Sequence, residues 1–192
     1  MTDDFRSRLN KIADRLSTDE LLSNKGLGNE IGFWIFDYPP ERELEVRSFI
    51  DGVLLPGMAK RQPALRPAVV NLFNLIIELL EDRKLLGRVL DIQTTKGDAA
   101  ALTALRPVLK EDKLAERIAS QIDFDQVDML LLTGVGAAYP MLRSHTLLAG
   151  LQATMKDKPV VMFYPGRYDG FSLRLFNKLA DDHYYRAFRL VE

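Results

Sequence analysis

Continuous apolar runs of strand length recur along this chain. Three of them are rich in apolar, β-branched or aromatic residues, and each is followed by a turn signal or a polar residue. They cover residues 31–36, 67–73 and 127–133. Runs without polar alternation are typical of strands that are covered on both faces, as in a parallel sheet. Two further strands are predicted over residues 160–164 and 184–191.

Between these runs, apolar residues recur every three to four positions, which predicts amphipathic helices. Such helices are expected over residues 3–22, 40–55, 74–82 and 140–155, with further charged, helix-favouring sequence over 83–120. We expect Pro56-Gly57 to stop the second helix and Pro140 to begin the fourth. Apolar residues at helical spacing from Phe171 onward predict another helix after the strand at 160–164.

Buried strands that alternate with amphipathic helices predict an α/β fold. We expect a single domain over residues 1–192, with a mostly parallel sheet of four to five strands, helices on both faces, and a helical insertion around 74–120. The apolar strand that ends in Asp37 gives a layout similar to that of P-loop nucleotide hydrolases. The phosphate-binding loop G-x-x-x-x-G-K-[ST] is absent, so that hydrolysis is not expected, and Asp37 is expected to cap the turn before Pro39-Pro40.

Composition narrows the functional classes. The net charge of −1 argues against independent tight binding to nucleic acid, which depends on several lysines or arginines reaching phosphates. The absence of cysteine excludes disulfides and thiol catalysis. No apolar run approaches the ~20 residues that span a bilayer, and the first residues lack the layout of a secretory signal. We therefore expect a soluble, cytoplasmic protein with no membrane contact.

One candidate site follows the strand at 160–164. In α/β folds, ligands and partners meet the loops at the carboxyl ends of the strands. Gly166 and Gly170 enclose Arg167, Tyr168 and Asp169 at such a position. The simpler interpretation is that proline and glycine make the turn, Asp169 caps the next helix and Arg167 is solvated.

A second candidate loop follows the strand at 127–133. It carries Tyr139 and leads into the helix expected from Pro140, whose first turns would favour an anion. Arg143 would add a charged donor there, and His145 a titratable one. His145 also lies beside an apolar stripe, so it fits equally well a buried structural histidine.

No set of residues assembles into a catalytic or metal centre. Asp123, Asp125 and Asp128 precede a strand, at the amino edge of the sheet, where α/β sites are rare. Ser144 and Ser172 have no evident base in the sequence. We expect no catalytic residue, no cofactor and no metal ligand.

Several segments, in this order and spacing, resemble the BrxB family of the bacteriophage-exclusion (BREX) defence systems. They are Gly28-Asn-Glu-Ile31, Leu130–Gly136, Leu142–Leu147, Phe163–Gly170 and Tyr184–Leu190. The resemblance implies a small cytoplasmic component of a multi-protein antiphage island. Other components of such islands include a DNA methyltransferase, an AAA+ ATPase and a PglZ-type protein that resembles alkaline phosphatases. The resemblance supplies no catalytic residues.

The expected function is therefore a non-catalytic binding or assembly subunit of a BREX complex, with the PglZ-type protein as its direct partner. The residues expected to bind a partner or an anion are Tyr139, Arg143, His145, Arg167, Tyr168 and Asp169. The alternative is a subunit that senses nucleotide or nucleic acid, in which Arg143, His145 and Arg167 hold the anion and Asp37 or Asp169 holds a metal. DNA is expected as a partner only within a complex.

Overall fold

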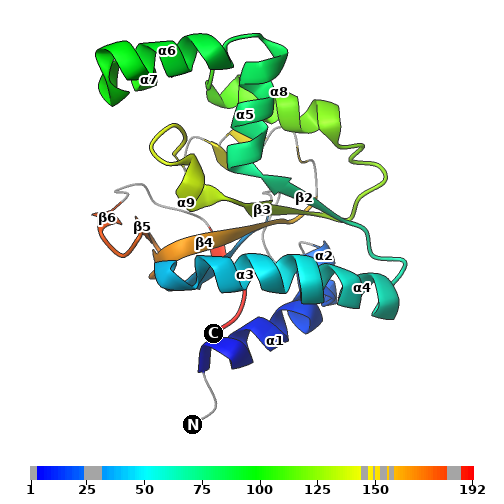
Figure 1. Ribbon diagram of the computed structural model, residues 1–192. Coiled ribbons are helices and arrows are strands. Elements are labelled where there is room, and N and C mark those ends of the chain that lie inside the picture. The colour runs from blue at the N-terminus through cyan, green and yellow to red at the C-terminus, as the bar shows by residue number, and fades with distance from the viewer. Residues whose placement is uncertain are drawn as a thin grey trace.

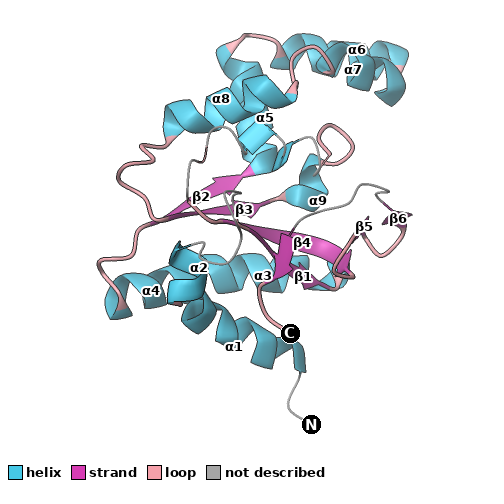
Figure 2. Ribbon diagram, turned by 180° about the vertical axis from the view of Figure 1, so that it is seen from behind, coloured by secondary structure: helices cyan, strands magenta, loops and turns pink. Residues whose placement is uncertain are grey.

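The computed structural model describes residues 4–23, 32–143, 147–148, 150–151, 155, 158–180 and 187–192. It has three layers, with a sheet between two layers of helices (Figures 1 and 2). The predicted α/β fold with a mostly parallel sheet and helices on both faces is confirmed.

Parallel strands form the body of the sheet, in the order β2-β3-β4-β1-β7. Their bounds are β1 Phe33–Tyr38, β2 Pro67–Asn71, β3 Met129–Thr133, β4 Val160–Tyr168 and β7 Ala187–Arg189. The short strands β5 (Leu173–Leu175) and β6 (Leu179–Ala180) add an antiparallel extension to the end of β4. Since the main strands are parallel, β1, β4 and β7 place their carboxyl ends at one edge of the sheet.

Successive side chains of a strand point to opposite faces, and this divides the core in two. Trp34 and Phe36 face one helical layer, and Ile35 between them faces the other. The first layer contains α1 (Asp4–Leu16), α2 (Asp19–Ser23), η1 (Pro40–Arg42), α3 (Glu43–Phe49), η2 (Ile50–Leu54) and α4 (Leu55–Arg61). The second contains α5 (Leu72–Asp82), α6 (Leu86–Lys96), α7 (Asp98–Leu105), α8 (Glu111–Gln121) and α9 (Val135–Ala138).

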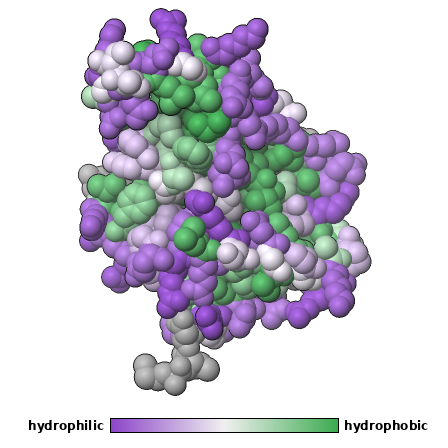
Figure 3. Space-filling view, in the orientation of Figure 1, coloured by the Kyte–Doolittle hydropathy of each residue, from purple (hydrophilic) through white to green (hydrophobic). Residues whose placement is uncertain are grey.

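The helical block between β2 and β3 rises above the sheet, and its α6–α7 pair lies farthest from it (Figure 1). No residue of α6 is fully buried. An apolar groove of about 440 Å³ separates this pair from α5 and from the chain at Met141. Figure 3 shows apolar side chains gathered at the base of the α6–α7 pair.

The expected helix stop at Pro56-Gly57 is wrong, because helical structure continues from Pro40 to Arg61. The chain forms a π-helical turn, η2, immediately before the proline, and the Leu55 N–H donates to the Ile50 carbonyl. Inside a regular α-helix the proline ring would clash with the carbonyl four residues earlier. The wider π turn gives the ring room without ending the helix.

The helix expected after Pro165 is also wrong. Strand β4 continues through Pro165 and Gly166 to Tyr168, and the chain then returns as β5. Pairing with β3 extends only to Met162, so Pro165 lies beyond the part of β4 that has a neighbour on that side. A Cβ on Gly166 would lie 2.2 Å from the Arg174 carbonyl oxygen. Glycine is therefore needed because β5 approaches so closely.

Pro140 does not begin a helix. The short helix α9 precedes it, Tyr139 is extended, and the Tyr139–Pro140 peptide bond is cis. Residues before proline are biased toward extended backbone, and this interrupts the helix that the sequence suggested. Helical structure is present again at residues 147, 148, 150 and 151.

Candidate functional site

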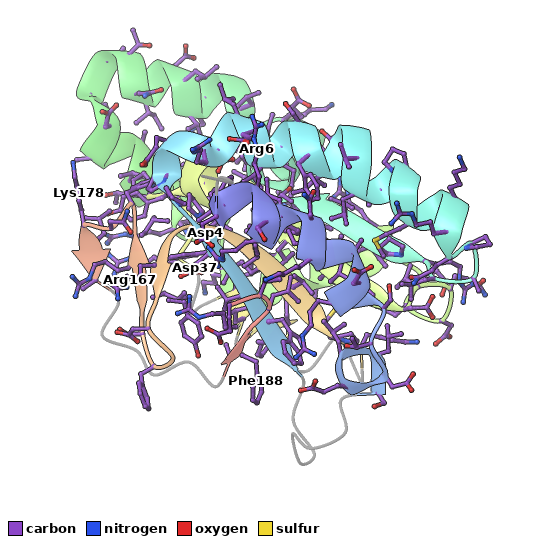
Figure 4. All side chains as sticks on the ribbon, turned by 90° about the horizontal axis from the view of Figure 1, so that it is seen from below. Asp4, Arg6, Asp37, Arg167, Lys178 and Phe188 are labelled. Atoms are coloured by element: carbon purple, nitrogen blue, oxygen red, sulfur yellow. The ribbon has the colours of Figure 1, made fainter. Side chains whose placement is uncertain are left out.

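Four residues meet at the carboxyl edge of the sheet. Asp37 lies near the end of β1, Tyr168 ends β4 and Arg189 ends β7. Arg8 reaches the same place from α1. Asp37 lies inside the molecule near this edge (Figure 4). The parallel strand order brings these residues together although they are distant in the sequence.

The Asp37 carboxylate is 5% exposed, and both its oxygens are engaged. Oδ1 accepts from Arg8 Nη2 at 2.8 Å and from Arg189 Nη1 at 3.1 Å. Oδ2 accepts from the Tyr168 backbone N–H at 2.9 Å. Asp37 therefore does not cap the turn before Pro39-Pro40 as expected. A metal ion bound here would have to displace two guanidinium groups.

The two arginines extend this network to the backbone. Arg8 donates to the Asp37 carbonyl at 3.0 Å and to the Val191 carbonyl at 3.2 Å. Its guanidinium also lies 5.0 Å from the centre of the Phe36 ring, within cation–π range. Arg189 donates to the Tyr168 carbonyl. The network thus fixes the ends of β1, β4 and β7 to one another and to α1.

Tyr168 is buried, with 1% of its surface exposed. Its hydroxyl lies 2.7 Å from the Ala187 carbonyl and 3.0 Å from the Gly170 carbonyl, and it can donate to either. Tyr168 therefore has almost no exposed surface with which to meet a partner or an anion. Its hydroxyl instead joins the end of β4 to β7 through a hydrogen bond in the interior of the protein.

Asp169 organises the turn that follows. Its Oδ1 accepts the backbone N–H groups of Phe171 and Ser172 at 2.9 and 2.8 Å, and its Oδ2 accepts the Ser172 hydroxyl at 3.0 Å. These bonds, led by the Ser172 N–H, lower the pKa of Asp169 below its ordinary value. Asp169 thus caps a hairpin turn rather than the helix that was expected.

Arg167 lies on the exposed side of this β4–β5 hairpin and directly opposite Arg174. Lys178 follows in the turn between β5 and β6, and Figure 4 shows Arg167 and Lys178 at the same end of the molecule. No ion pair joins Arg167, Arg174 or Lys178 to another side chain in the described part of the structure. The sequence pattern offers no reason to group these cations, because it predicts a helix over residues 171–179.

The second candidate loop contacts this hairpin through Tyr139. Its ring packs edge-on against Phe176, with 6.3 Å between the ring centres. Arg143 is exposed on the same loop, and His145 lies outside the described residues. The helix start at Pro140 that would have favoured an anion is not formed, so the expected anion site loses that part of its basis.

The described residues contain neither a metal-binding cluster nor a membrane-spanning helix. No group of three or more His, Asp or Glu side chains among them could hold a metal ion. None of the helices that the structure describes has the length and apolarity needed to cross a membrane.

The chain is similar to known proteins over nearly its whole length. Residues 68–190 match the family model "BREX protein BrxB". A BREX protein BrxB of Escherichia coli O9:H4 (strain HS) is 41% identical over 184 residues, covering 96% of this chain and 90% of the relative. A BREX protein BrxB of Bacillus cereus (strain H3081.97) is 38% identical over 192 residues, covering 98% of each. No solved structure matches the chain. The resemblance to BrxB is confirmed, and the chain belongs to the BrxB family of BREX proteins.

Proposed function

We propose that this protein is a non-catalytic assembly subunit of a BREX phage-defence complex and that it contacts the PglZ-type component. Membership of the BrxB family supports a role among other BREX proteins. The chemistry of the site supports the proposal that the subunit is non-catalytic. Its buried carboxylate and two arginines are engaged with one another, which leaves them suited to holding strands together rather than to binding a substrate.

The observation that carries the proposal is an exposed arginine on a rigidly held hairpin. Arg167 lies next to Tyr168, whose N–H, carbonyl and hydroxyl are all bound to neighbouring strands or to Arg189. A partner that meets Arg167 therefore meets a side chain on an ordered backbone. Arginine on a pre-ordered surface is a frequent anchor of protein interfaces.

Co-purification tests the proposal. The full chain is co-expressed with the PglZ-type protein of the same defence island, as wild type and as Arg167→Glu. Arg88→Glu, on α6 and outside the hairpin, changes the net charge equally at another exposed arginine and serves as the matched control. Thermal melting confirms that each variant is folded.

We expect the wild type and Arg88→Glu to elute with the PglZ-type protein as a stoichiometric complex, and Arg167→Glu to elute alone. If the wild type elutes alone, the proposed partner is wrong. The sensing role would then be tested by melting with magnesium and a nucleotide panel, in which a ligand at ~100-fold its Kd adds about 2.7 kcal/mol of stability.

A further inference from the structure

The exposed face of the β4–β5–β6 extension places two positive charges side by side. Arg167 on β4 and Arg174 on β5 are direct partners in an antiparallel pair, and Ala180 on β6 is the partner of Arg174 on its other side. We call Arg167, Arg174 and Ala180 the hairpin face. Directly opposed residues have Cβ atoms about 4.5–5.5 Å apart, and like charges at this spacing destabilise the pair.

The two arginines cannot turn toward the core, because buried side chains occupy the other face of the hairpin. Tyr168 and Leu173, the next pair along, are buried, and so is Leu175 after Arg174. Both arginines are exposed, and no described carboxylate forms an ion pair with either of them. The described chain thus keeps an unfavourable charge pair that its own acids do not offset.

We propose that the hairpin face binds an acidic segment of a partner protein, with one carboxylate paired to Arg167 and another to Arg174. This inference rests on the proposed assembly role, to which it adds the chemistry of the contact. Arginine pairs carboxylates through two parallel N–H···O bonds. Two such pairs would replace a mutual repulsion by attraction and would orient the segment across β4 and β5. Ala180 leaves room for it on the β6 side.

A protein segment fits this face better than the backbone of nucleic acid. Duplex binding draws on about six to ten phosphate contacts, whereas the hairpin offers Arg167, Arg174 and Lys178. An exposed acid also adjoins it, because Asp169 lies in the turn two residues after Arg167. A continuous polyanion would meet this carboxylate, whereas a short acidic segment could end before it.

A photocrosslinker placed at Ala180 would identify the segment. The full chain carrying p-benzoylphenylalanine at this position is co-expressed with the other BREX proteins of its island, irradiated, and digested for mass spectrometry. The expected product joins residue 180 to a partner peptide with at least two nearby Asp or Glu residues. Crosslinks to nucleic acid, or to a segment without carboxylates, would overturn the inference.

Charge exchange then tests the pairing without the crosslinker. We expect Arg174→Glu to weaken binding of the captured component about tenfold or more, and Arg174→Lys to retain part of it. Exchanging the crosslinked carboxylates for lysines should restore binding to Arg174→Glu, while Arg88→Glu should bind like the wild type.

The outcomes separate this inference from the broader proposal. If the component binds wild type and Arg174→Glu equally, the acidic contact is wrong and the assembly role stands. If no BREX protein is captured by the wild type, both are overturned.

Discussion

Arg189 Nη1 donates to both oxygens of the Asp37 carboxylate, at 3.1 and 3.2 Å, although the two residues lie 152 positions apart. Arg8 approaches the same carboxylate from α1. One buried negative charge is thus matched by two positive ones and by the Tyr168 N–H. This arrangement makes Asp37 the residue whose loss we expect to unfold the edge of the sheet.

Replacing Asp37 by Asn should lower the free energy of unfolding by about 3–5 kcal/mol, because both guanidinium groups would lose their counter-charge in a mostly buried place. Urea unfolding followed by circular dichroism would measure the change. Glu45→Gln is the control, since Glu45 pairs with Arg6 and Arg42 at the surface and its loss should cost about 1 kcal/mol or less. Similar losses for the two variants would contradict the role assigned to Asp37.

The Tyr168 hydroxyl fastens β4 to β7, so Tyr168→Phe should lower the free energy of unfolding by about 1–2 kcal/mol. The Ala187 carbonyl, 2.7 Å away, would lose its hydroxyl partner. Tyr139→Phe is the control, because the Tyr139 ring is half-buried and its hydroxyl makes no hydrogen bond in the described structure. We expect this variant to change the free energy of unfolding by no more than about 0.5 kcal/mol. Denaturant unfolding of both variants would measure the two changes. If Tyr168→Phe has the same free energy of unfolding as the wild type, the hydrogen bond of the hydroxyl does not stabilise the protein.

The stability of the protein should fall at alkaline pH because of Tyr38. Burial, followed by the negative charge of Glu43, raises the pKa of Tyr38 far above its ordinary value, and the hydroxyl donates to Glu43 Oε2 at 2.5 Å. The unfolded chain releases this proton near pH ~10, whereas the folded protein retains it. The contribution of the protonated Tyr38 hydroxyl to the stability of the folded protein is therefore complete below pH ~10 and decreases above it.

Urea unfolding between pH 8 and 11 would test this. The loss of stability above pH ~10 should be smaller in Tyr38→Phe than in the wild type, although the variant is less stable at neutral pH. Parallel curves for the two proteins would show that Tyr38 is not responsible.

Gly166→Ala should destabilise the hairpin, because the new Cβ would lie 2.2 Å from the Arg174 carbonyl oxygen. We expect a loss of about 1–3 kcal/mol, the usual cost of overpacking. Gly57→Ala is the matched control, since a Cβ there meets no atom within 4 Å, and in a helix alanine should add about 0.5–1 kcal/mol. Thermal melts should therefore move in opposite directions, and a shift of both in the same direction would contradict the close approach of β5.

The turn at Asp169 should loosen in acid. Hydrogen bonds to the carboxylate lower the pKa of Asp169, so its contribution is present above the ordinary carboxyl pKa and is lost as the pH falls through the lowered value. Amide hydrogen exchange at Phe171 and Ser172 would report this. Asp169→Asn keeps an oxygen acceptor and should retain protection at low pH, whereas Asp169→Ala should lose protection at every pH.

Strands β1 and β3 were predictable because their signal is local. The runs at 31–36 and 127–133 correspond to them, and continuous burial on both faces leaves such a pattern in the sequence. The run at 67–73 corresponds to β2, which lies at the edge of the sheet and is only partly buried. The resemblance to BrxB was also carried by segments that could be read directly from the chain.

The contacts at the carboxyl edge were not predictable in the same way. The sequence pattern predicts a turn at Pro165-Gly166, since nothing nearby shows that a strand ending at residue 175 will pack against Gly166. Asp37 likewise carries no local sign that Arg8 and Arg189 will neutralise it. Both depend on tertiary contacts, which secondary-structure propensity and hydrophobic periodicity do not report.

The order of strands also has a consequence for synthesis. Strand β1 lies between β4 and β7, so a ribosome must translate more than a hundred further residues before either neighbour exists. Until then the aromatic run from Phe33 to Tyr38 is an unpaired strand with a carboxylate at its end. Pairing of β1 on both sides is therefore a late event of synthesis, because it requires the chain as far as residue 189.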